Sequence, residues 1–434
     1  MKKILNICLL AILVSCQTAP SYNSTNIGLG KDPQLPEPSI SFIPTVNIAR
    51  ASSWPEGIKP QVKDGFIITE YSRELTHPRW LYVLPNGDIL VAQSNKQPPK
   101  KTKGLKDLVA GYIMKRAGAG VDSPDKITLL RDKNGDGTEV LAYDFLKELH
   151  SPFGMALIGN DLYVANTDAV IRFHYKSGDT VIDTKKYPPE KIVDLPEGDI
   201  NYHWTKNIIA SSDGTKLFVT VGSNSNIAEN GLNKEEERAN ILEVDLKTKQ
   251  KRVYASGLRN PNGLAWHPKT NELWTVVNER DELGNDLVPD YLTSVNDNDF
   301  FGWPYIYYGN YKDPRVKELM PNNLHLRSPD YALGSHVAAL GLVFSNLSQF
   351  KSPFKNGVFV SEHGSWNRKP RSGYKVVFIA FENDKPHGLP IDVVTDFVVN
   401  DEAYGRPVGL VIDSKGNLLI ADDVGNRVWK LSQK

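Results

Sequence analysis

The side chains with the clearest chemical potential in this sequence are histidines and arginines that recur at one place in a repeated pattern, just before an apolar segment typical of a strand. The set consists of His77, Arg79, His150, His203, Arg259, His336 and Arg406 and includes four of the nine histidines. Arginine attracts an anionic ligand, and a neutral imidazole accepts a proton near neutral pH. If the fold gathers these residues, they form a site that binds an anion and removes a proton from a substrate.

A second concentration of polar groups lies in residues 278–286, NERDELGND, which contains four carboxylates. Oxygen ligands at this density suit Ca²⁺, although a solvated acidic loop is the alternative. The run DKNGDG at 132–137 imitates the start of an EF-hand loop but lacks the distal glutamate. We interpret it as a tight hairpin turn.

The elements that must position these residues form six copies of one phrase. Each copy has a polar entry, a strand with glycine or apolar residues, a turn and a second apolar strand. The copies begin at His77, Ser151, Trp204, Asn260, Ala339 and Arg406. With the strand candidates that follow each copy, they predict an all-β chain with a six-bladed β-propeller in residues 61–434.

The last predicted blade is one strand short after residues 427–432, and residues 65–71 can supply that strand and close the ring. A seven-bladed ring with a degenerate blade inside 280–335 is the alternative. Because the first strand of each propeller blade lines the channel, the recurring histidines and arginines are expected to meet at one mouth of it.

The amino terminus reads as an export signal. Met1-Lys2-Lys3 precedes an apolar run that is too short to span a bilayer, and the run ends in LVSC at 13–16. This ending resembles a bacterial lipobox, so we expect residues 1–16 to contain the signal and Cys16 to be lipidated. Residues 17–60, rich in Ser, Asn and Pro, are predicted to be a flexible tether. The predicted location is the cell envelope, with the outer membrane favoured because Gln17 follows the cysteine.

The net charge and the cysteine count argue against several classes of function. The chain has 51 basic and 51 acidic residues, so its formal charge is zero, which argues against a nucleic-acid partner. Of the two cysteines, Cys8 lies in the predicted signal and Cys16 is the predicted lipid site. Disulfides, thiolate metal sites and covalent c-type haem are therefore not expected.

Five blocks of sequence together resemble the soluble sugar dehydrogenases that use pyrroloquinoline quinone (PQQ), in particular the sorbosone dehydrogenase-like and PQQ-dependent pyranose dehydrogenase branch. The resemblance covers about residue 65 to the carboxyl terminus. The blocks are GLRNPNGLA (257–265), NERDELGNDLVPDYLT (278–293), FGWP (301–304), SEHGSWNR (361–368) and GRPVG (405–409). The resemblance implies an oxidoreductase that holds PQQ and Ca²⁺ at the propeller mouth.

Site residues follow from that resemblance and from the recurring positions. The residues assigned to the cofactor are Arg79, Arg259, Asn260, His363, Arg368 and Arg406. The calcium positions fall on Asp281 and Glu282, and His336 and Trp303 are assigned to substrate contacts. His203 occupies the place of the family's general base. Tyr202 precedes it where the glucose enzymes carry aspartate, which argues against glucose itself.

The expected reaction is oxidation of a sugar or related hydroxyl or aldehyde substrate by hydride transfer to the quinone. Because no haem motif is present, a separate cytochrome or quinone is expected to accept the electrons. Two alternatives come from other function classes: a Ca²⁺-dependent propeller lactonase, and a propeller that only binds an envelope partner. Lactonases hold Ca²⁺ with carboxylates from several blades, whereas the recurring positions here are histidine and arginine.

Overall fold

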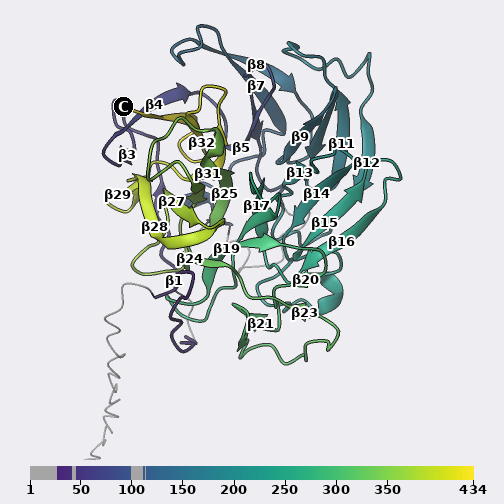
Figure 1. The fold of residues 1–434 in the computed structure, drawn as a ribbon, viewed down its shortest axis with the longest axis vertical. Coiled ribbons are helices and arrows are strands. Elements are labelled where there is room, and N and C mark those ends of the chain that lie inside the picture. Colours follow the sequence, from purple (N-terminus) through teal and green to yellow (C-terminus); the bar gives the residue numbers. More distant parts are fainter. Residues whose placement is uncertain (1–26, 42–44, 99–110, 113) are drawn as a thin grey trace, which may run out of the picture.

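The computed structural model describes residues 27–41, 45–98, 111–112 and 114–434. In this part of the chain the fold is nearly all β (Figure 1). The named helices are two short 3₁₀ turns, Leu232–Lys234 and Ser345–Leu347. None of the described helices is long and apolar enough to cross a bilayer.

Six sheets of four or more strands follow one another along the chain. The first three contain β5 (Pro78–Val83), β6 (Ile89–Gln93), β7 (Lys126–Asp132) and β8 (Val140–Leu146); β9 (Met155–Ile158), β10 (Asp161–Ala165), β11 (Ala169–His174) and β12 (Glu190–Asp194); and β13 (Ile208–Ala210), β14 (Lys216–Val221), β15 (Asn240–Asp245) and β16 (Lys251–Ser256). The last three contain β17 (Pro261–Trp266), β18 (Leu273–Val277), β19 (Pro289–Val295) and β24 (Tyr331–Ser335); β25 (Ala339–Phe344), β26 (Gly357–Glu362), β27 (Lys375–Glu382) and β28 (Lys385–Thr395); and β31 (Pro407–Ile412), β32 (Leu418–Asp422), β33 (Arg427–Gln433) and β4 (Phe66–Ser72).

The first strands of these sheets contact one another in a closed circuit that runs β5, β9, β13, β17, β25, β31 and back to β5. Figure 1 shows the sheets arranged around this centre. Such a radial arrangement of four-stranded sheets is a β-propeller, so the all-β propeller prediction is confirmed. We call the end of the circuit at which the first strands begin the mouth. The loops between the second and third strands of each sheet return to that end.

Recurring glycines explain how the first strands come so close together. A Cβ on Gly154 would lie 2.3 Å from the amide nitrogen of Ile208 in the next sheet. A Cβ on Gly341 would lie 2.2 Å from the carbonyl oxygen of Val408, and Gly263 and Gly409 meet neighbouring backbone in the same way. In the four copies that carry it, this glycine is therefore required where two backbones approach around the channel.

A strand from the amino-terminal part of the chain joins the sixth sheet. β4 runs antiparallel to β33, with Phe66 opposite Gln433 and Ser72 opposite Val428. The region proposed as a degenerate seventh blade instead contains the short strands β20 (Asp299–Phe300), β21 (Ile306–Tyr307), β22 (Tyr311–Lys312) and β23 (His325–Leu326). Within the described residues, β20 and β23 extend the third sheet and β21 pairs only with β22.

The described part of the predicted tether packs against the body, which differs from the expectation for residues 17–60. β1 (Leu29–Gly30) joins the edge of the fourth sheet, and β2 (Arg50–Ala51) pairs with β30 (Glu402–Ala403), which in turn pairs with β29 (Val398–Val399). β3 (Gln61–Val62) extends the fifth sheet. Ala49 and Trp54 are buried in a core cluster. We call residues 27–41 and 45–54 the strap; residues 17–26, like Cys16, lie outside the described residues.

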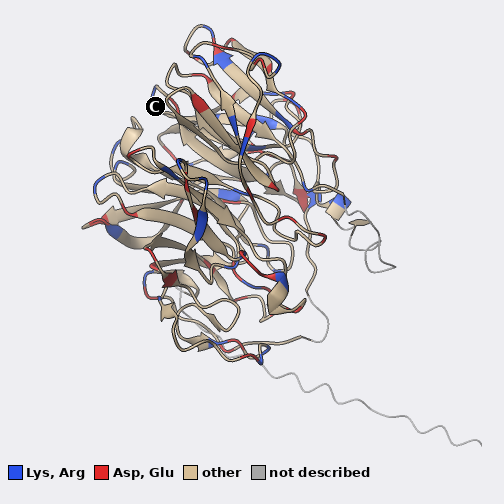
Figure 2. Ribbon diagram, turned by 90° about the vertical axis from the view of Figure 1, so that its right-hand side faces the viewer, with Lys and Arg blue, Asp and Glu red and all other residues tan. Residues whose placement is uncertain are grey.

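In Figure 2, basic and acidic positions are interspersed along the ribbon. This mixture agrees with the formal charge of zero. The DKNGDG run forms the turn between β7 and β8, where the Asp132 carboxylate accepts hydrogen bonds from the amides of Gly135 and Gly137. Its interpretation as a hairpin turn is confirmed.

One buried carboxyl makes stability depend on pH. Glu362 in β26 is 1% exposed, and its Oε2 has no hydrogen-bond partner among the described residues. Burial raises its pKa to about 8. Because the ordinary value is near 4.3, the native state holds this proton more tightly than the unfolded chain does. Stability is therefore greatest below that ordinary value and falls as pH rises towards 8.

We expect Glu362→Gln to remove this loss, since glutamine keeps the shape and carries no charge. At pH 9 the variant should exceed the parent in unfolding free energy by on the order of 2–4 kcal/mol, given about 1.4 kcal/mol per pKa unit. At pH 4 the two should agree. Urea unfolding at both pH values measures this, with exposed Glu318→Gln as the matched control. Equal stabilities of variant and parent at pH 9 would contradict the assignment.

Candidate functional site

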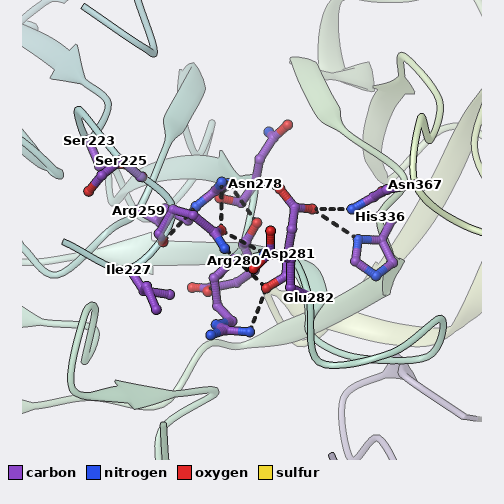
Figure 3. Close-up of polar contacts among 12 residues, drawn as sticks. Ser223, Ser225, Ile227, Arg259, Asn278, Arg280, Asp281, Glu282, His336 and Asn367 are labelled. Carbon is purple, nitrogen blue, oxygen red and sulfur yellow. Dashed lines mark hydrogen bonds and ion pairs between the residues drawn. The ribbon is translucent and has the colours of Figure 1, made fainter. Parts of the chain in front are cut away.

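Asp281, in the loop after β18, is the centre of a polar network at the mouth (Figure 3). Its Oδ1 accepts a hydrogen bond from Asn367 Nδ2 at 2.8 Å and lies 3.2 Å from His336 Nδ1. Its Oδ2 lies 3.3 Å from Arg259 Nη2. Although burial opposes ionisation, His336 and Arg259 hold the pKa of Asp281 well below its usual value. The Asp281 carboxylate is therefore ionised.

Arg259 and Asn260 stand at the start of β17 and are almost fully buried. The Arg259 guanidinium donates to the carbonyl of Glu279 at 2.7 Å and to both oxygens of Asn226 at 3.1 and 3.3 Å. The backbone of Asn260 accepts from the amide of Asn278. The fourth-sheet loop and the loop after β14 thus hold this arginine rigidly at the mouth.

His203 lies between Arg259 and the loop after β14. Its Nδ1 is 2.8 Å from the carbonyl oxygen of Ser223, which can only accept, so Nδ1 carries the proton and Nε2 has the lone pair. Burial, reinforced by the charge of Arg259, lowers the pKa of His203 well below its usual value. A Cβ on Gly222 would lie 2.5 Å from His203 Cβ, so this position requires glycine. The imidazole is therefore a neutral, oriented proton acceptor.

Asp423, after β32, is the centre of a second buried group on the opposite side of the mouth. Its carboxylate is paired with Arg79 and lies 2.9 Å from His363 Nε2 and 3.8 Å from His77 Nε2. Burial lowers the pKa of His363 to about 4, although Asp423 opposes this shift. Three of the four members come from predicted positions, but Asp423 was not predicted.

Arg406 stands beside the Asp423 group. Its guanidinium carbon lies 5.1 Å from the ring centroid of Tyr374, and its Nη2 is 3.4 Å from that hydroxyl. The structure thus brings Arg79, His363 and Arg406 together, and it brings His203, Arg259, Asn260, Asp281 and His336 together.

Other predicted residues lie apart. Arg368 is already bound to the loop after β18, where it donates to the carbonyl of Asn285 and pairs with Asp286, each at 2.8 Å. Glu282 pairs with Arg315 and is more than a third exposed. Trp303 contacts the site through Asn226, because its Nε1 donates to the Asn226 carbonyl at 2.9 Å. Arg368 is therefore poorly placed to complete the cofactor clamp.

Three residues of the site were missed in the sequence: Asn226, Asn367 and Asp423. Asn367 belongs to the SEHGSWNR block, which offered a signal, whereas Asn226 and Asp423 follow second strands in positions that the repeated phrase does not mark. His150, also at the mouth, lies 3.1 Å from Asp168 and 3.6 Å from Glu197, which commits both ring nitrogens to carboxylates.

Unpaired buried atoms show what kind of ligand this mouth fits. Arg79 Nε and Arg406 Nε are buried donors without a hydrogen-bond partner among the described residues, and Asn260 Oδ1 and Asn367 Oδ1 are acceptors in the same condition. Buried polar groups normally have partners, so these atoms favour a polar ligand. The two arginine donors fit an anion such as a carboxylated quinone.

The contacts of Asp281 do not fit a bound Ca²⁺ in the present arrangement. Both carboxylate oxygens face Arg259, His336 and Asn367, and the Asp281 carbonyl accepts from Arg280 and Asn226. Ca²⁺ needs oxygens that are not already paired with cations.

The pattern of the TrAA12-like family matches residues 128–298 and 319–434, which is more than half of the sequence. The chain belongs to this family. Four of the five blocks that carried the resemblance lie entirely within the matched segments. The fifth block, FGWP, falls between them. The predicted kinship with soluble PQQ-dependent sugar dehydrogenases is confirmed.

Similar proteins agree with this membership. An uncharacterized protein of Borreliella burgdorferi is 29% identical over 297 residues, which cover 67% of this chain and 77% of that protein. The calcium structure of a Trichoderma reesei AA12 protein has a TM-score of 0.69 at 17% identity and covers 90% of this chain and 99% of its own. The holo PQQ domain of Coprinopsis cinerea pyranose dehydrogenase has a TM-score of 0.65 at 18% identity, with coverage of 89% and 100%. At these identities the two structures show a shared fold.

Proposed function

We propose that this protein is a PQQ-dependent dehydrogenase that oxidises a sugar or a related hydroxyl or aldehyde substrate. The observation that carries the proposal is the pairing of a neutral His203, with Nε2 available, and buried arginines that have unpaired donors. Family membership and the PQQ-bound Coprinopsis domain support it. We interpret the six sheets as six blades and the pairing of β4 with β33 as the closure.

Different residues of this chain would bind the cofactor and accept the proton. Arg259, Arg406 and Arg79 would hold the carboxylates of PQQ, and Asn260 would bond its polar edge. When bound, PQQ supplies an ortho-quinone that accepts a hydride from the substrate carbon. His203 Nε2 would accept the proton of the hydroxyl group on that carbon, so that the carbon–oxygen bond becomes a carbonyl as the hydride leaves. The carbonyl of Ser223 fixes the tautomer that this transfer needs.

An absorbance titration of the purified protein with PQQ tests the proposal, first without added metal and then with Ca²⁺. Saturable binding followed by bleaching with an aldose, sorbosone or a simple alcohol is the expected result. Binding without bleaching by any of them would favour a binding propeller, and no binding together with lactone hydrolysis would favour a lactonase. The Trichoderma AA12 protein was solved as a calcium structure, so we also propose that this mouth takes Ca²⁺, with ligands other than the paired oxygens of Asp281. Tighter PQQ binding with Ca²⁺ is the result that would support it.

Arg259→Ala should weaken PQQ binding by about 10- to 100-fold, since a charge-assisted hydrogen bond contributes roughly 1.5–3 kcal/mol. The same titration measures it. Arg368→Ala is the matched control, because that guanidinium is already paired with Asp286. Equal losses in the two variants would remove Arg259 from the clamp.

We also propose that the chain is an envelope lipoprotein anchored through Cys16, and that its electrons leave to a separate cytochrome or quinone. The LVSC sequence after the short apolar run supports the anchor. Cys16→Ala should move the protein from the membrane fraction to the soluble fraction without changing its thermal unfolding. A Cys16→Ala protein that remains in the membrane after a salt wash would contradict the anchor.

A further inference from the structure

The strap leaves the folded body at the mouth. A Cβ on Gly28 would lie 3.6 Å from Ser335 Oγ and 3.7 Å from Pro289 Cβ, and Ser335 immediately precedes His336 of the site. From there the strap follows the rim, because the amide of Ser39 donates to the carbonyl of Leu283. Further on, the amide of Asn47 donates to the carbonyl of Trp366 in another mouth loop.

The length of chain between this point and the predicted anchor is short. From Cys16 to Ile27 there are 27 − 16 = 11 residue steps, which span at most about 40 Å when fully extended. A body of this size is about 50 Å across. A lipid on Cys16 therefore keeps the mouth side of the body, and not its far side, within reach of the bilayer.

Six of the eighteen large apolar side chains that are exposed among the described residues lie at the rim of the mouth. They come from the strap and from four separate mouth loops: the β6–β7 loop, the segment before β13, the β14–β15 loop and the β26–β27 loop. These residues are Ile40, Val46, Val121, Tyr202, Leu232 and Trp366, each between 39% and 57% exposed. We call them the apolar rim.

The rim is built onto well-ordered contacts. The carbonyl of Val121 accepts from Asn95 Nδ2 at 2.7 Å. A Cβ on Gly118 would lie 2.9 Å from both Ala51 of the strap and Val424 beside the site, so this loop packs against the strap. Tyr202 adjoins His203 itself. Tryptophan and tyrosine favour the boundary between headgroups and acyl chains, and exposed aliphatic side chains gain by entering it.

We propose that the mouth of the channel lies against the bilayer, with the apolar rim in contact with phospholipid headgroups. The inference rests on the proposed lipid anchor, and on the proposed function for the mouth being the active site. The inference also specifies the separate electron acceptor, because a mouth at the bilayer favours a membrane-dissolved quinone over a soluble cytochrome.

The experiment uses the lipidated full chain in phospholipid vesicles. Once Cys8 is removed with the signal and Cys16 is modified, the protein has no free thiol, so an introduced cysteine is labelled uniquely. Val121→Cys places a fluorophore on the rim. Val181→Cys, 57% exposed in the connection from β11 to β12, places it at the far end, since β11 leads away from the mouth. Vesicles with nitroxide-labelled headgroups serve as the quencher.

We expect about threefold or greater quenching at position 121 relative to 181, because nitroxide quenching needs near contact. The same labels on a protein that begins at Gln17, and so has neither Cys8 nor Cys16 and carries no lipid, should lose most of this difference. Equal quenching at the two positions, stronger quenching at 181, or a mature protein whose Cys16 has no lipid by mass spectrometry would each overturn the inference. The readout requires neither PQQ nor turnover, so a protein that passes this test and fails to bind PQQ contradicts only the proposed function.

Discussion

His203→Gln is expected to leave PQQ bound and to slow its reduction by substrate by about 10²–10⁴-fold, the usual cost of removing a general base. In the parent protein, the carbonyl of Ser223 accepts a hydrogen bond from His203 Nδ1. The side-chain amide of glutamine can donate the same hydrogen bond. It has no nitrogen lone pair that accepts a proton at neutral pH. A single-turnover experiment that follows the cofactor spectrum after mixing with substrate measures the effect.

The structure limits which other histidine could be the general base if His203→Gln left the rate unchanged. His336 has Nδ1 next to the Asp281 carboxylate and Nε2 2.9 Å from the carbonyl of Gly284, so both nitrogens face acceptors. It therefore has no free lone pair. An unchanged reduction rate in His203→Gln would transfer the role of base to His363, whose Nε2 faces Asp423. Loss of bound cofactor would instead make His203 a binding residue.

Trp54→Ala should lower the unfolding free energy by about 3–5 kcal/mol, as expected for a buried aromatic side chain cut to alanine. Trp54 is 5% exposed, and its ring lies 5.2 Å from that of Trp429 and 5.9 Å from that of Phe397. Its Nε1 donates to Asp422 Oδ2 at 2.8 Å, so truncation also removes a partner from a buried carboxylate. Denaturant unfolding measures the loss.

Trp366→Ala is the matched control, since Trp366 is 39% exposed and should change stability by less than about 0.5 kcal/mol. Similar small effects in both variants would show that the strap contributes nothing to the folded body. A large effect confined to Trp54 would show that the segment after the predicted anchor is part of the folded domain, with little free tether between them.

The sheets were predictable because their signal is local. Alternation of apolar and polar residues and the turn residues lie within about a dozen residues of each other in each copy, and four of the six copies add a glycine in the first strand. The need for a strand from residues 65–71 followed from counting strands in the last copy. Trp54 escaped prediction because a single buried tryptophan in a segment rich in serine and proline has no periodicity.

The sequence by itself determined the propeller, its family and the identity of His203, Arg259 and Arg406 as residues of one mouth, since each stands at a repeated position. Only the tertiary structure decided their partners. Asp423 meets Arg79 across 344 positions of the chain, and Asp281 meets Asn367 across 86. Such pairs form when the ring closes and brings loops of different sheets together. No local pattern encodes that proximity, which is why the pairing of Arg368 with the loop after β18 and the course of the strap became visible only in the folded chain.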